Sequence, residues 1–530
     1  MLRLLPPRPL LRIGLRHASS TPSRTIFRRS FVVVGGVALA ASVGLGSKVY
    51  MDAATVALPL PTPSASKDSD DKTPFKSLLR TYVVYSMCSF PWLVDNAPRL
   101  LETFSSIPGL KWLTESFFVG GDSAAETLPV LRTLRENNTG TLFAYSIEVD
   151  EAEAMASASS GSTQNSPHKA IVKEMLNCID VAADFEANLG ARKAGKRTWV
   201  AVKMTALLPD ASALIRLSSH IIATRAPTAL PLVVFPGNPV ASDLAVLSSK
   251  GNALLTSSDI AMLRELHKDL EAICARASSR GVRIIIDAEY SWYEPAIDAL
   301  ALALMRQFNA GTDGPLVYAT YQAYLRRTQA HLLHALKDAQ KHKYALGAKL
   351  VRGAYHPHEI AAHGAAGLSI SPDALPPVWG VKADTDASYN ACAGMLLDAV
   401  AEDVKRKSGA PQSVGVLFGT HNWESCRTII KGLHERGLGV TTPEGRLRIE
   451  ERVAERITFG QLYGMCDDLT QYLAQRMESS APMVIKYVPY GALAEVMPYL
   501  SRRAIENKSI LGSGTAKHER ERAWALMKFW

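Results

Sequence analysis

Two adjacent arginines near the end of the chain could bind a carboxylate. Arg502 and Arg503 lie in YLSRRAIEN, residues 499–507, after apolar residues at helical spacing, so Arg503 falls on or beside the buried face of a predicted helix. A guanidinium can hold a carboxylate by two parallel hydrogen bonds, and two of them can orient a small ring. The alternative is a weak surface ion pair with Glu506. The segment alone favours the ion pair, and the rest of the chain favours the carboxylate site.

Polar or charged residues also end seven consecutive apolar runs that read as buried strands. A Gly-Ala pair at 353–354 lets a ligand approach the backbone next to Lys349 and Arg352. Together these features predict a site for a large polar ligand, and a redox cofactor with a phosphate tail suits the two cations. The residues at the seven ends are Lys203, Asp287, Glu289, Gln322, Lys349, Arg352, Thr420, His421, Asn422, Gln461, Leu462, Tyr463 and Tyr487.

Two motifs that suggest other chemistry do not support it. HPHEIAAH, residues 356–363, resembles a zinc signature, but its second histidine comes one residue too late, so the two imidazoles would point to different faces of a helix. His421 in GTHN could be a general base, yet a lone histidine at a strand end is as often a hydrogen-bonding group for a cofactor. The chain has no GxSxG, DFG or CxxC motif that would indicate a hydrolase, a kinase or a thiol enzyme.

The elements that must position these residues repeat in a regular order. Short apolar runs alternate with longer helix-patterned segments such as 260–280 and 323–342. Eight buried strands, each followed by a helix, predict an α/β fold of the (βα)8 TIM-barrel type, in which the site lies at the carboxyl ends of the strands. An open doubly wound sheet would normally carry a Gly-rich nucleotide turn, and no complete one occurs. The eight runs are 141–148, 199–207, 282–290, 315–324, 344–355, 414–422, 457–465 and 484–491.

The charge of the chain is concentrated at its start. The 530 residues are 47% hydrophobic and 21% charged, with a net charge of +9. Residues 1–51 hold seven arginines, one lysine and no acid, so about +1 remains for the other residues. A nucleic-acid-binding protein would need basic residues concentrated on its folded domain. The composition therefore predicts an ordinary globular protein that does not bind nucleic acid.

The N-terminal segments predict targeting to an organelle. Residues 1–30 are rich in Arg and Ser and lack acids, as in mitochondrial transit peptides. The apolar segment 31–51 is a candidate membrane anchor, although its uncharged run of 31–46 falls just short of a bilayer span. Seven arginines before this run argue against a secretory signal. The six cysteines also lack metal or redox spacing and indicate free thiols in a reducing compartment.

The rest of the chain divides by composition. Residues 52–75 are rich in Pro, Ser, Thr and Asp and predict a linker, and the pattern of 76–135 predicts an N-terminal helical region. The barrel is expected over 136–530, with a disordered, low-complexity insertion near 150–168.

Several motifs in a fixed order resemble those of the mitochondrial proline dehydrogenase family. They are DAEY, YQAY, AKLVRGAY, FGTHN, FGQLYGMCD, KYVPYG and YLSRRAIEN, and the resemblance extends from roughly residue 110 to the end. It implies a flavin (βα)8 barrel that oxidises L-proline to 1-pyrroline-5-carboxylate and passes the electrons to a membrane quinone. It also implies FAD as the cofactor and a location on the matrix side of the inner mitochondrial membrane.

The same resemblance implies roles for individual residues. The substrate carboxylate would be held by Arg502 and Arg503, with Lys203 as a third cation, and Leu462 and Tyr487 would pack against the substrate ring. Asp287, Lys349 and Tyr487 would form the catalytic set. The residues implied to contact FAD are Ala288, Gln322, Lys349, Arg352, Gly353, Ala354, Thr420, His421 and Glu506.

Three other functions remain open from the sequence. A hydroxyproline dehydrogenase would need space where Tyr487 lies, and a methylenetetrahydrofolate reductase would need a pteridine-binding acid and has no use for the arginine pair. A non-catalytic inner-membrane scaffold would be expected to have lost charged groups from its strand ends, which this chain retains.

Overall fold

The computed structural model describes most of the predicted barrel. Its described residues are 82, 119–146, 167–190, 195–225, 236–311, 314–365, 368–371, 373–406, 413–492, 496, 520–521, 524–525 and 527–528. The predicted transit peptide, apolar segment and linker lie outside these residues, as do most of the N-terminal helical region and of the insertion. Arg502, Arg503 and Glu506 also lie outside them.

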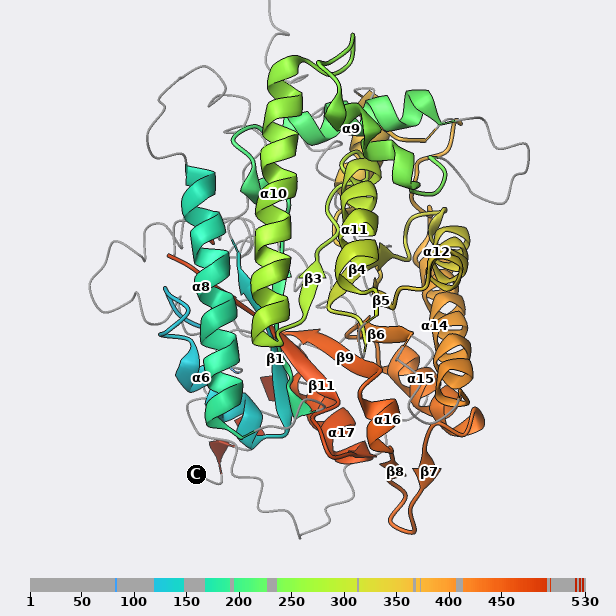
Figure 1. The fold of residues 1–530 in the computed structure, drawn as a ribbon. Helices are drawn as coiled ribbons and strands as arrows, with labels where there is room; N and C mark the ends of the chain where they lie inside the picture. Colours follow the sequence, from blue (N-terminus) through green and yellow to red (C-terminus); the bar gives the residue numbers. More distant parts are fainter. Residues whose placement is uncertain are drawn as a thin grey trace, which may run out of the picture. The chain divides into compact units, whose positions relative to one another are not determined.

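Eight parallel strands form a closed barrel, which confirms the predicted fold class (Figure 1). Around the barrel the strands follow the order β1-β11-β9-β6-β5-β4-β3-β2, and β1 closes it by pairing with β11 from Thr139↔Val484 to Tyr145↔Tyr490. Each of the eight predicted runs contributes one strand. The strands are β1 (Thr139–Tyr145), β2 (Thr198–Val202), β3 (Ile284–Ile286), β4 (Val317–Gln322), β5 (Leu346–Val351), β6 (Val414–Gly419), β9 (Ile457–Leu462) and β11 (Val484–Tyr490).

Alternate residues of each strand face the barrel interior and the surrounding helices. Trp199, Ile285 and Tyr318 belong to a small interior cluster, and the rings of Trp199 and Tyr318 lie 5.3 Å apart. Gly347 on β5 leaves room for Tyr318, because a Cβ there would come within 2.8 Å of its ring. The interior is therefore packed with side chains and is not a pore, as is usual for this fold.

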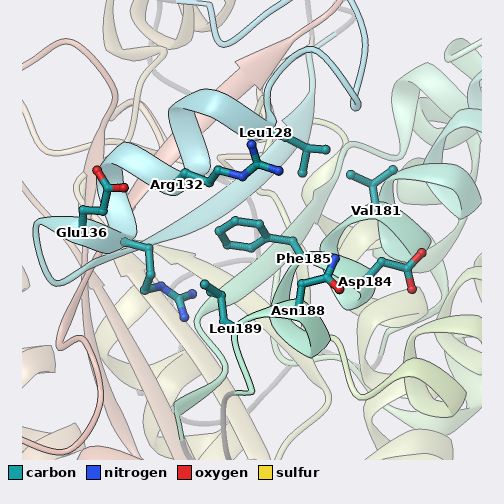
Figure 2. Close-up of a pocket in the computed structure, with 9 residues that line it drawn as sticks. Leu128, Arg132, Glu136, Val181, Asp184, Phe185, Asn188 and Leu189 are labelled. Atoms are coloured by element: carbon teal, nitrogen blue, oxygen red, sulfur yellow. The ribbon is translucent and has the colours of Figure 1, made fainter.

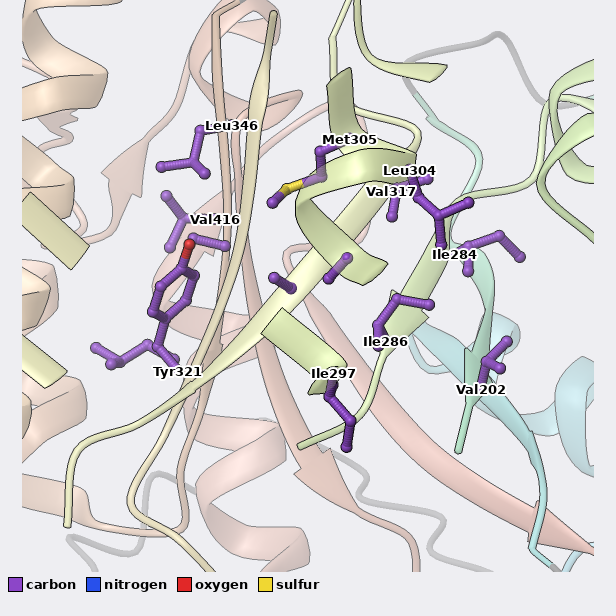
Figure 3. Packing of buried hydrophobic residues seen from close by; sticks show 14 of the residues in the cluster. Val202, Ile284, Ile286, Ile297, Leu304, Met305, Val317, Tyr321, Leu346 and Val416 are labelled. Atoms are coloured by element: carbon purple, nitrogen blue, oxygen red, sulfur yellow. The ribbon is translucent and has the colours of Figure 1, made fainter. Parts of the chain in front are cut away.

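Helices cover the outside of the barrel and bury the other face of each strand. Figure 3 shows Ile297, Leu304 and Met305 of one such helix beside strand residues such as Ile286 and Val317, and all belong to the same core cluster. Both faces of the strands are thus buried, which explains why the runs read as continuously apolar. The helices are α6 (Leu128–Glu136), α8 (Pro167–Asn188), α9 (Ser212–Thr224), α10 (Ser257–Arg280), α11 (Glu294–Phe308), α12 (Thr328–His342), α13 (His356–Ala365), α14 (Lys382–Val404), α15 (Trp423–Glu435), α16 (Glu451–Ala454) and α17 (Asp467–Arg476), with 3₁₀ turns η2 (Thr205–Leu207) and η3 (Ala241–Ser248).

Local signals place the ends of the longest helix. Thr256 precedes α10 and accepts a hydrogen bond from the Asp259 backbone N–H, while the Asp259 carboxylate accepts one from the Thr256 backbone. At the other end Gly281 adopts a left-handed φ of 69°, which glycine allows without strain. Such reciprocal capping satisfies backbone groups that a helix end leaves unpaired.

Every predicted run extends past the carboxyl end of its strand, and three of the runs do so by four or five residues. The run 282–290 forms only the three-residue strand β3, the run 199–207 turns into η2 after Val202, and the run 344–355 ends as a strand at Val351. Apolar residues in these segments, such as Met204 and Leu207, pack in the core from turns instead of strands. Burial alone therefore does not tell a strand from a buried turn.

Two further features were not predicted. A small three-stranded sheet, β10-β8-β7, lies next to the barrel, formed by β7 (Val440–Thr441), β8 (Leu447–Arg448) and β10 (Met477–Glu478). Strands of two residues carry no readable periodicity. The second feature is that helix α8 already begins at Pro167, and a proline is well tolerated in the first helical turn.

The described part of the chain contains no helix that is both long and apolar enough to cross a bilayer. The candidate anchor at 31–51 lies outside that part.

Candidate active site

Asp287, Lys349 and Tyr487 meet at the carboxyl end of the barrel. The Lys349 Nζ atom lies 2.6 Å from Asp287 Oδ1, and the Tyr487 hydroxyl donates a hydrogen bond of 3.2 Å to Asp287 Oδ2. The ammonium of Lys349 is also 5.6 Å from the centre of the Tyr487 ring. The side chains of the ion pair are 12% and 8% exposed, so the pair is largely shielded from solvent. Residues from β5, β11 and the loop after β3 thus form one connected group.

The alternation along the strands explains why these residues meet. Ile285 and Ile485 face the interior, and Asp287 and Tyr487 lie two residues further along the same strand directions. Side chains two residues apart on a strand point to the same face. The same spacing assigns Lys203, which follows Trp199 and Ala201, to the interior face. The last inward-facing residue of each of these strands therefore lies at the carboxyl end of the barrel, which we call its mouth.

Hydrogen bonds fix the backbone around Asp287. Its backbone N–H donates to the Val202 carbonyl (2.9 Å), and the Thr320 hydroxyl donates to the Ile286 carbonyl (2.7 Å). The Gln322 side-chain amide donates to the Glu289 carbonyl at 2.9 Å. Gln322 is buried and is engaged with the protein backbone in this structure. The short strand β3 thus has its carboxyl end held by both neighbouring strands.

Arg352 forms a second group of contacts directly after β5. Its guanidinium donates to Asp386 (2.7 Å), to the Thr420 hydroxyl (2.7 Å) and to the Ser425 hydroxyl (2.8 Å). It also lies 4.4 Å from the centre of the Tyr389 ring, whose pKa is raised by burial. These contacts hold the guanidinium beside the start of α15. A fixed cation at a helix N-terminus is well suited to an anionic group such as a phosphate.

His421 accepts a hydrogen bond in this structure. The backbone N–H of Leu462 donates to His421 Nε2 at 2.9 Å. Because Nε2 accepts, a neutral ring carries its proton on Nδ1. This contact joins β6 to β9 and favours the hydrogen-bonding role of His421 over that of a general base.

Gly353 adopts a backbone conformation that other residues rarely take. Its φ is 126°, and a Cβ at this position would come within 2.4 Å of the Tyr324 ring. The backbone N–H of Tyr324 donates to the Arg352 carbonyl at 2.7 Å, which holds the two loops together. Glycine is therefore required here for close approach of a ring, and the neighbouring Ala354 is exposed.

Hydrogen bonds join seven of the predicted site residues in three separate groups, namely Asp287 with Lys349 and Tyr487, Arg352 with Thr420, and Leu462 with His421. Lys203, Ala288 and Leu462 are half-buried, and Thr420 is buried at the end of β6. Arg502, Arg503 and Glu506 lie outside the described residues, so their predicted roles stay predictions.

Several residues at this end of the barrel were missed by the sequence analysis. Asp386 and Ser425 bind Arg352, and Lys486, only 2% exposed, lies 2.9 Å from the Asp467 carboxylate and donates to the Met465 carbonyl at 2.7 Å. A lysine within an apolar run such as VIKYVP is a signal for such a buried contact, since buried lysines need partners. Glu359, a further unpredicted residue, lies inside the zinc-like motif 356–363. Among the described residues no group of three or more His, Cys, Asp or Glu side chains could hold a metal ion.

A groove of about 520 Å³ lies elsewhere, between α6 and α8 (Figure 2). Its lining includes Leu128 and Arg132 from α6 and Phe185 from the last turns of α8, which lead into β2. The groove is therefore at the amino end of the strands, whereas sites of this fold lie at the carboxyl end. The carboxyl end of the barrel, with the polar contacts described above, is therefore the better candidate for the active site.

Comparison with known proteins identifies the family of this chain. The sequence pattern of the proline dehydrogenase family matches residues 131–515. A mitochondrial proline dehydrogenase 1 of Dictyostelium discoideum is 29% identical over 453 residues, which cover 83% of this chain and 70% of that protein. A hydroxyproline dehydrogenase of Rattus norvegicus is 30% identical over 466 residues, covering 86% of this chain and 90% of that protein.

A solved structure shares the fold. The crystal structure of proline utilization A from Bdellovibrio bacteriovorus, inactivated by N-propargylglycine, superimposes with a TM-score of 0.53 at 18% identity. The match covers 82% of this chain and 40% of that longer chain. At this identity the likeness supports the barrel architecture alone.

Proposed function

The chain belongs to the proline dehydrogenase family, oxidoreductases that act on the CH–NH group of proline, and on this premise we propose that it oxidises L-proline to 1-pyrroline-5-carboxylate. We propose FAD as the cofactor and a quinone of the inner mitochondrial membrane as the electron acceptor. The observation that carries the proposal is the group formed by Asp287, Lys349 and Tyr487, which lies at the carboxyl end of the barrel and within the matched residues.

The donor set at the mouth supports a cofactor with phosphate groups. Among the described residues, three of the five N–H groups of the Arg352 guanidinium have acceptors, namely Asp386, Thr420 and Ser425. Lys349 adds a second cation near the interior. The residues that would hold FAD are Ala288, Gln322, Lys349, Arg352, Gly353, Ala354, Thr420, His421 and Glu506. When bound, the flavin supplies the two-electron oxidation.

The chain's own residues would bind and orient the substrate. Arg502 and Arg503 would hold the proline carboxylate by paired hydrogen bonds, with Lys203 as a third cation. Their positive charges favour the neutral form of the proline amine, which is the form that can be oxidised.

Two further residues would border the substrate ring. Tyr487 and Leu462 would pack beside it and exclude water. Asp287 and Lys349 neutralise each other, so their pair adds no net charge next to the ring. A clamped carboxylate and a closely bordered ring would together fix the reacting carbon in one orientation.

The proposed location is the mitochondrion, on the matrix side of the inner membrane. Relatives named as mitochondrial and the arginine-rich, acid-free first thirty residues both support the organelle. Membrane association would bring the barrel to its quinone.

Hydroxyproline dehydrogenase is the second candidate function. Relatives with that name, from rat and mouse, are 30% and 31% identical and are covered over 90% of their length. A hydroxyproline ring needs space beside the ring carbon that Tyr487 would occupy in a proline site. The family assignment leaves no reason to retain the folate reductase.

The test is anaerobic reduction of the purified full-length protein. We expect bound FAD, released on denaturation, and bleaching of its visible absorbance by L-proline in preference to 4-hydroxy-L-proline. Preferential bleaching by hydroxyproline would select the second candidate. A protein that neither contains nor takes up FAD would refute the proposed cofactor.

A further inference from the structure

The loop that carries Asp287 is fastened at several points. This β3 loop, residues 287–293, has the backbone N–H of Glu289 donating to the Glu294 carboxylate at 2.7 Å. The Glu289 carboxylate in turn accepts a hydrogen bond of 3.1 Å from the Thr205 backbone N–H. These contacts fix the first half of the loop against α11 and η2.

A buried glutamate on a distant helix fastens the second half of the loop. Glu359 of α13 is 1% exposed and accepts hydrogen bonds from the Ser291 backbone N–H (2.7 Å) and the Ser291 hydroxyl (2.5 Å). The Tyr324 hydroxyl donates a third, longer bond of 3.4 Å. Within the described residues Glu359 has no ion pair, and burial raises the pKa of its carboxyl group. Burial of a carboxyl group lowers the free energy of unfolding unless hydrogen bonds compensate for the loss of water, and at Glu359 these bonds come from Ser291 and Tyr324.

The contacts of Glu359 join the same barrel units as the ion pair of the site. Ser291 follows β3, Tyr324 follows β4 and Glu359 follows β5, so one carboxylate links three consecutive units. Asp287 and Lys349 connect the first and third of these units inside the mouth, at 2.6 Å. Any shift of the β3 loop relative to α13 would therefore also change how Asp287 meets Lys349.

We propose that Glu359 is a positioning residue of the active site, which holds the β3 loop through Ser291 so that Asp287 stays against Lys349 and Tyr487. The inference rests on the proposed function for its kinetic consequence, but not for the fastening itself. Glu359 does not touch the reacting groups. A purely structural role would stabilise the barrel without changing the rate of oxidation.

Glu359→Met is the disrupting variant and Glu359→Gln the conservative one. Methionine has a similar length but no acceptor, so the Ser291 N–H is left unpaired. Glutamine can accept from the Ser291 N–H through its oxygen and donate to the Ser291 hydroxyl, which can reverse its direction. We expect the glutamine variant to retain most of the wild-type rate.

Glu186→Met is a control at the opposite end of the barrel, where the substitution also removes an ion pair with Arg135. Glu186 is also 1% exposed and accepts hydrogen bonds from the Arg197 backbone N–H (2.9 Å) and the Thr198 hydroxyl (2.6 Å). Its loss should destabilise the barrel from the amino end of β2. The control therefore separates a loss of stability from a loss of positioning.

Three measurements on the full chain test the proposal. Hydrogen–deuterium exchange of residues 287–293 should become faster in Glu359→Met and stay at the wild-type rate in Glu186→Met. The limiting rate of flavin bleaching at saturating L-proline, per bound flavin, should fall about 10- to 100-fold in Glu359→Met only, the size expected for a small misplacement of reacting groups. The affinity for an unreactive carboxylate ring analogue should change little.

The outcomes separate this inference from the proposed function. If L-proline does not bleach the wild type, the proposed function is wrong. The structural part of the inference is tested independently, because unchanged hydrogen–deuterium exchange of residues 287–293 in Glu359→Met would show that Glu359 does not hold the β3 loop. If the wild type is bleached and Glu359→Met reaches the wild-type limiting rate, the positioning role is overturned. Should Glu359→Met not fold, Ser291→Ala removes only the hydroxyl contact. It is expected to lower the limiting rate several-fold, and an unchanged rate there would also overturn the proposal.

Discussion

At the scale of single residues, the site depends on a buried ion pair with one additional partner. Asp287 has an ammonium on one oxygen and the Tyr487 hydroxyl on the other. Both oxygens of this largely buried carboxylate thus have partners. Removing the Lys349 ammonium or the Tyr487 hydroxyl would therefore take away one of the two contacts that position Asp287.

Lys349→Met should be strongly destabilising. It leaves the buried Asp287 carboxylate without its cation, and breaking a buried pair from one side costs about 3–5 kcal/mol in the free energy of unfolding. The measurement is urea unfolding of the purified protein at neutral pH.

The double variant with Asp287→Asn is the control for this prediction. Removing the unpaired charge should restore part of the loss, so the two changes should not be additive. A cost below about 1 kcal/mol for Lys349→Met alone, as for an exposed pair, would contradict the prediction.

At the scale of elements, helices on the outside of the barrel keep titratable groups buried as well. His331 of α12 packs against the Tyr321 ring of β4, with 5.2 Å between ring centres. Burial lowers the pKa of His331 to about 3, a drop that neighbouring Arg327 supports and Asp298 opposes. The folded protein therefore holds this imidazole neutral.

The packing of α12 should make stability fall in mild acid. Between about pH 6.5 and pH 3 the unfolded chain binds a proton at His331 that the folded chain does not, so the free energy of unfolding decreases as the pH falls. At about pH 5 this amounts to about 2 kcal/mol for one such group. His331→Leu should remove that part of the pH dependence.

Denaturant unfolding at about pH 8 and pH 5 tests this prediction. At the higher pH the imidazole is neutral in both states, so the difference between variant and wild type there measures the packing change alone. If both proteins lose the same stability between the two pH values, His331 is not the group responsible.

At the scale of the whole molecule, charge and catalytic geometry are found in different parts of the chain. Residues 1–51 carry about +8 of the net +9, whereas the barrel is nearly neutral. The N-terminal segment can therefore act as a targeting signal without contributing residues to the candidate active site.

Residues 1–51 should be sufficient and necessary for import into mitochondria. Fused to a fluorescent protein, they should direct it to mitochondria in cultured eukaryotic cells, whereas a chain beginning at Asp52 should stay in the cytosol. Fluorescence microscopy with a mitochondrial dye provides the measurement. Import of the shortened chain would show that targeting information lies elsewhere.

The barrel and the polar residues at the ends of its strands could be predicted from the sequence. Buried parallel strands are apolar on both faces, so each appeared as a run, and Asp287, Lys349 and Tyr487 were among the polar residues read at the ends of these runs. The strand limits were less accurate, because buried turns such as η2 are as apolar as strands. Periodicity reports burial and cannot report hydrogen bonding.

Which residues contact one another was decided only by the tertiary structure. Glu359 and Ser291 are 68 positions apart, and Arg352 reaches Ser425 over 73. No local pattern encodes such pairs, because closing the barrel is what brings the loops after β3, β4, β5 and β6 to one face. The sequence by itself determined the fold, the family and the residue types at the mouth. Closure of the barrel is what places α13 against the loop that carries Asp287. Only for this reason does Glu359, a residue of the zinc-like motif on α13, accept hydrogen bonds from Ser291 and hold that loop.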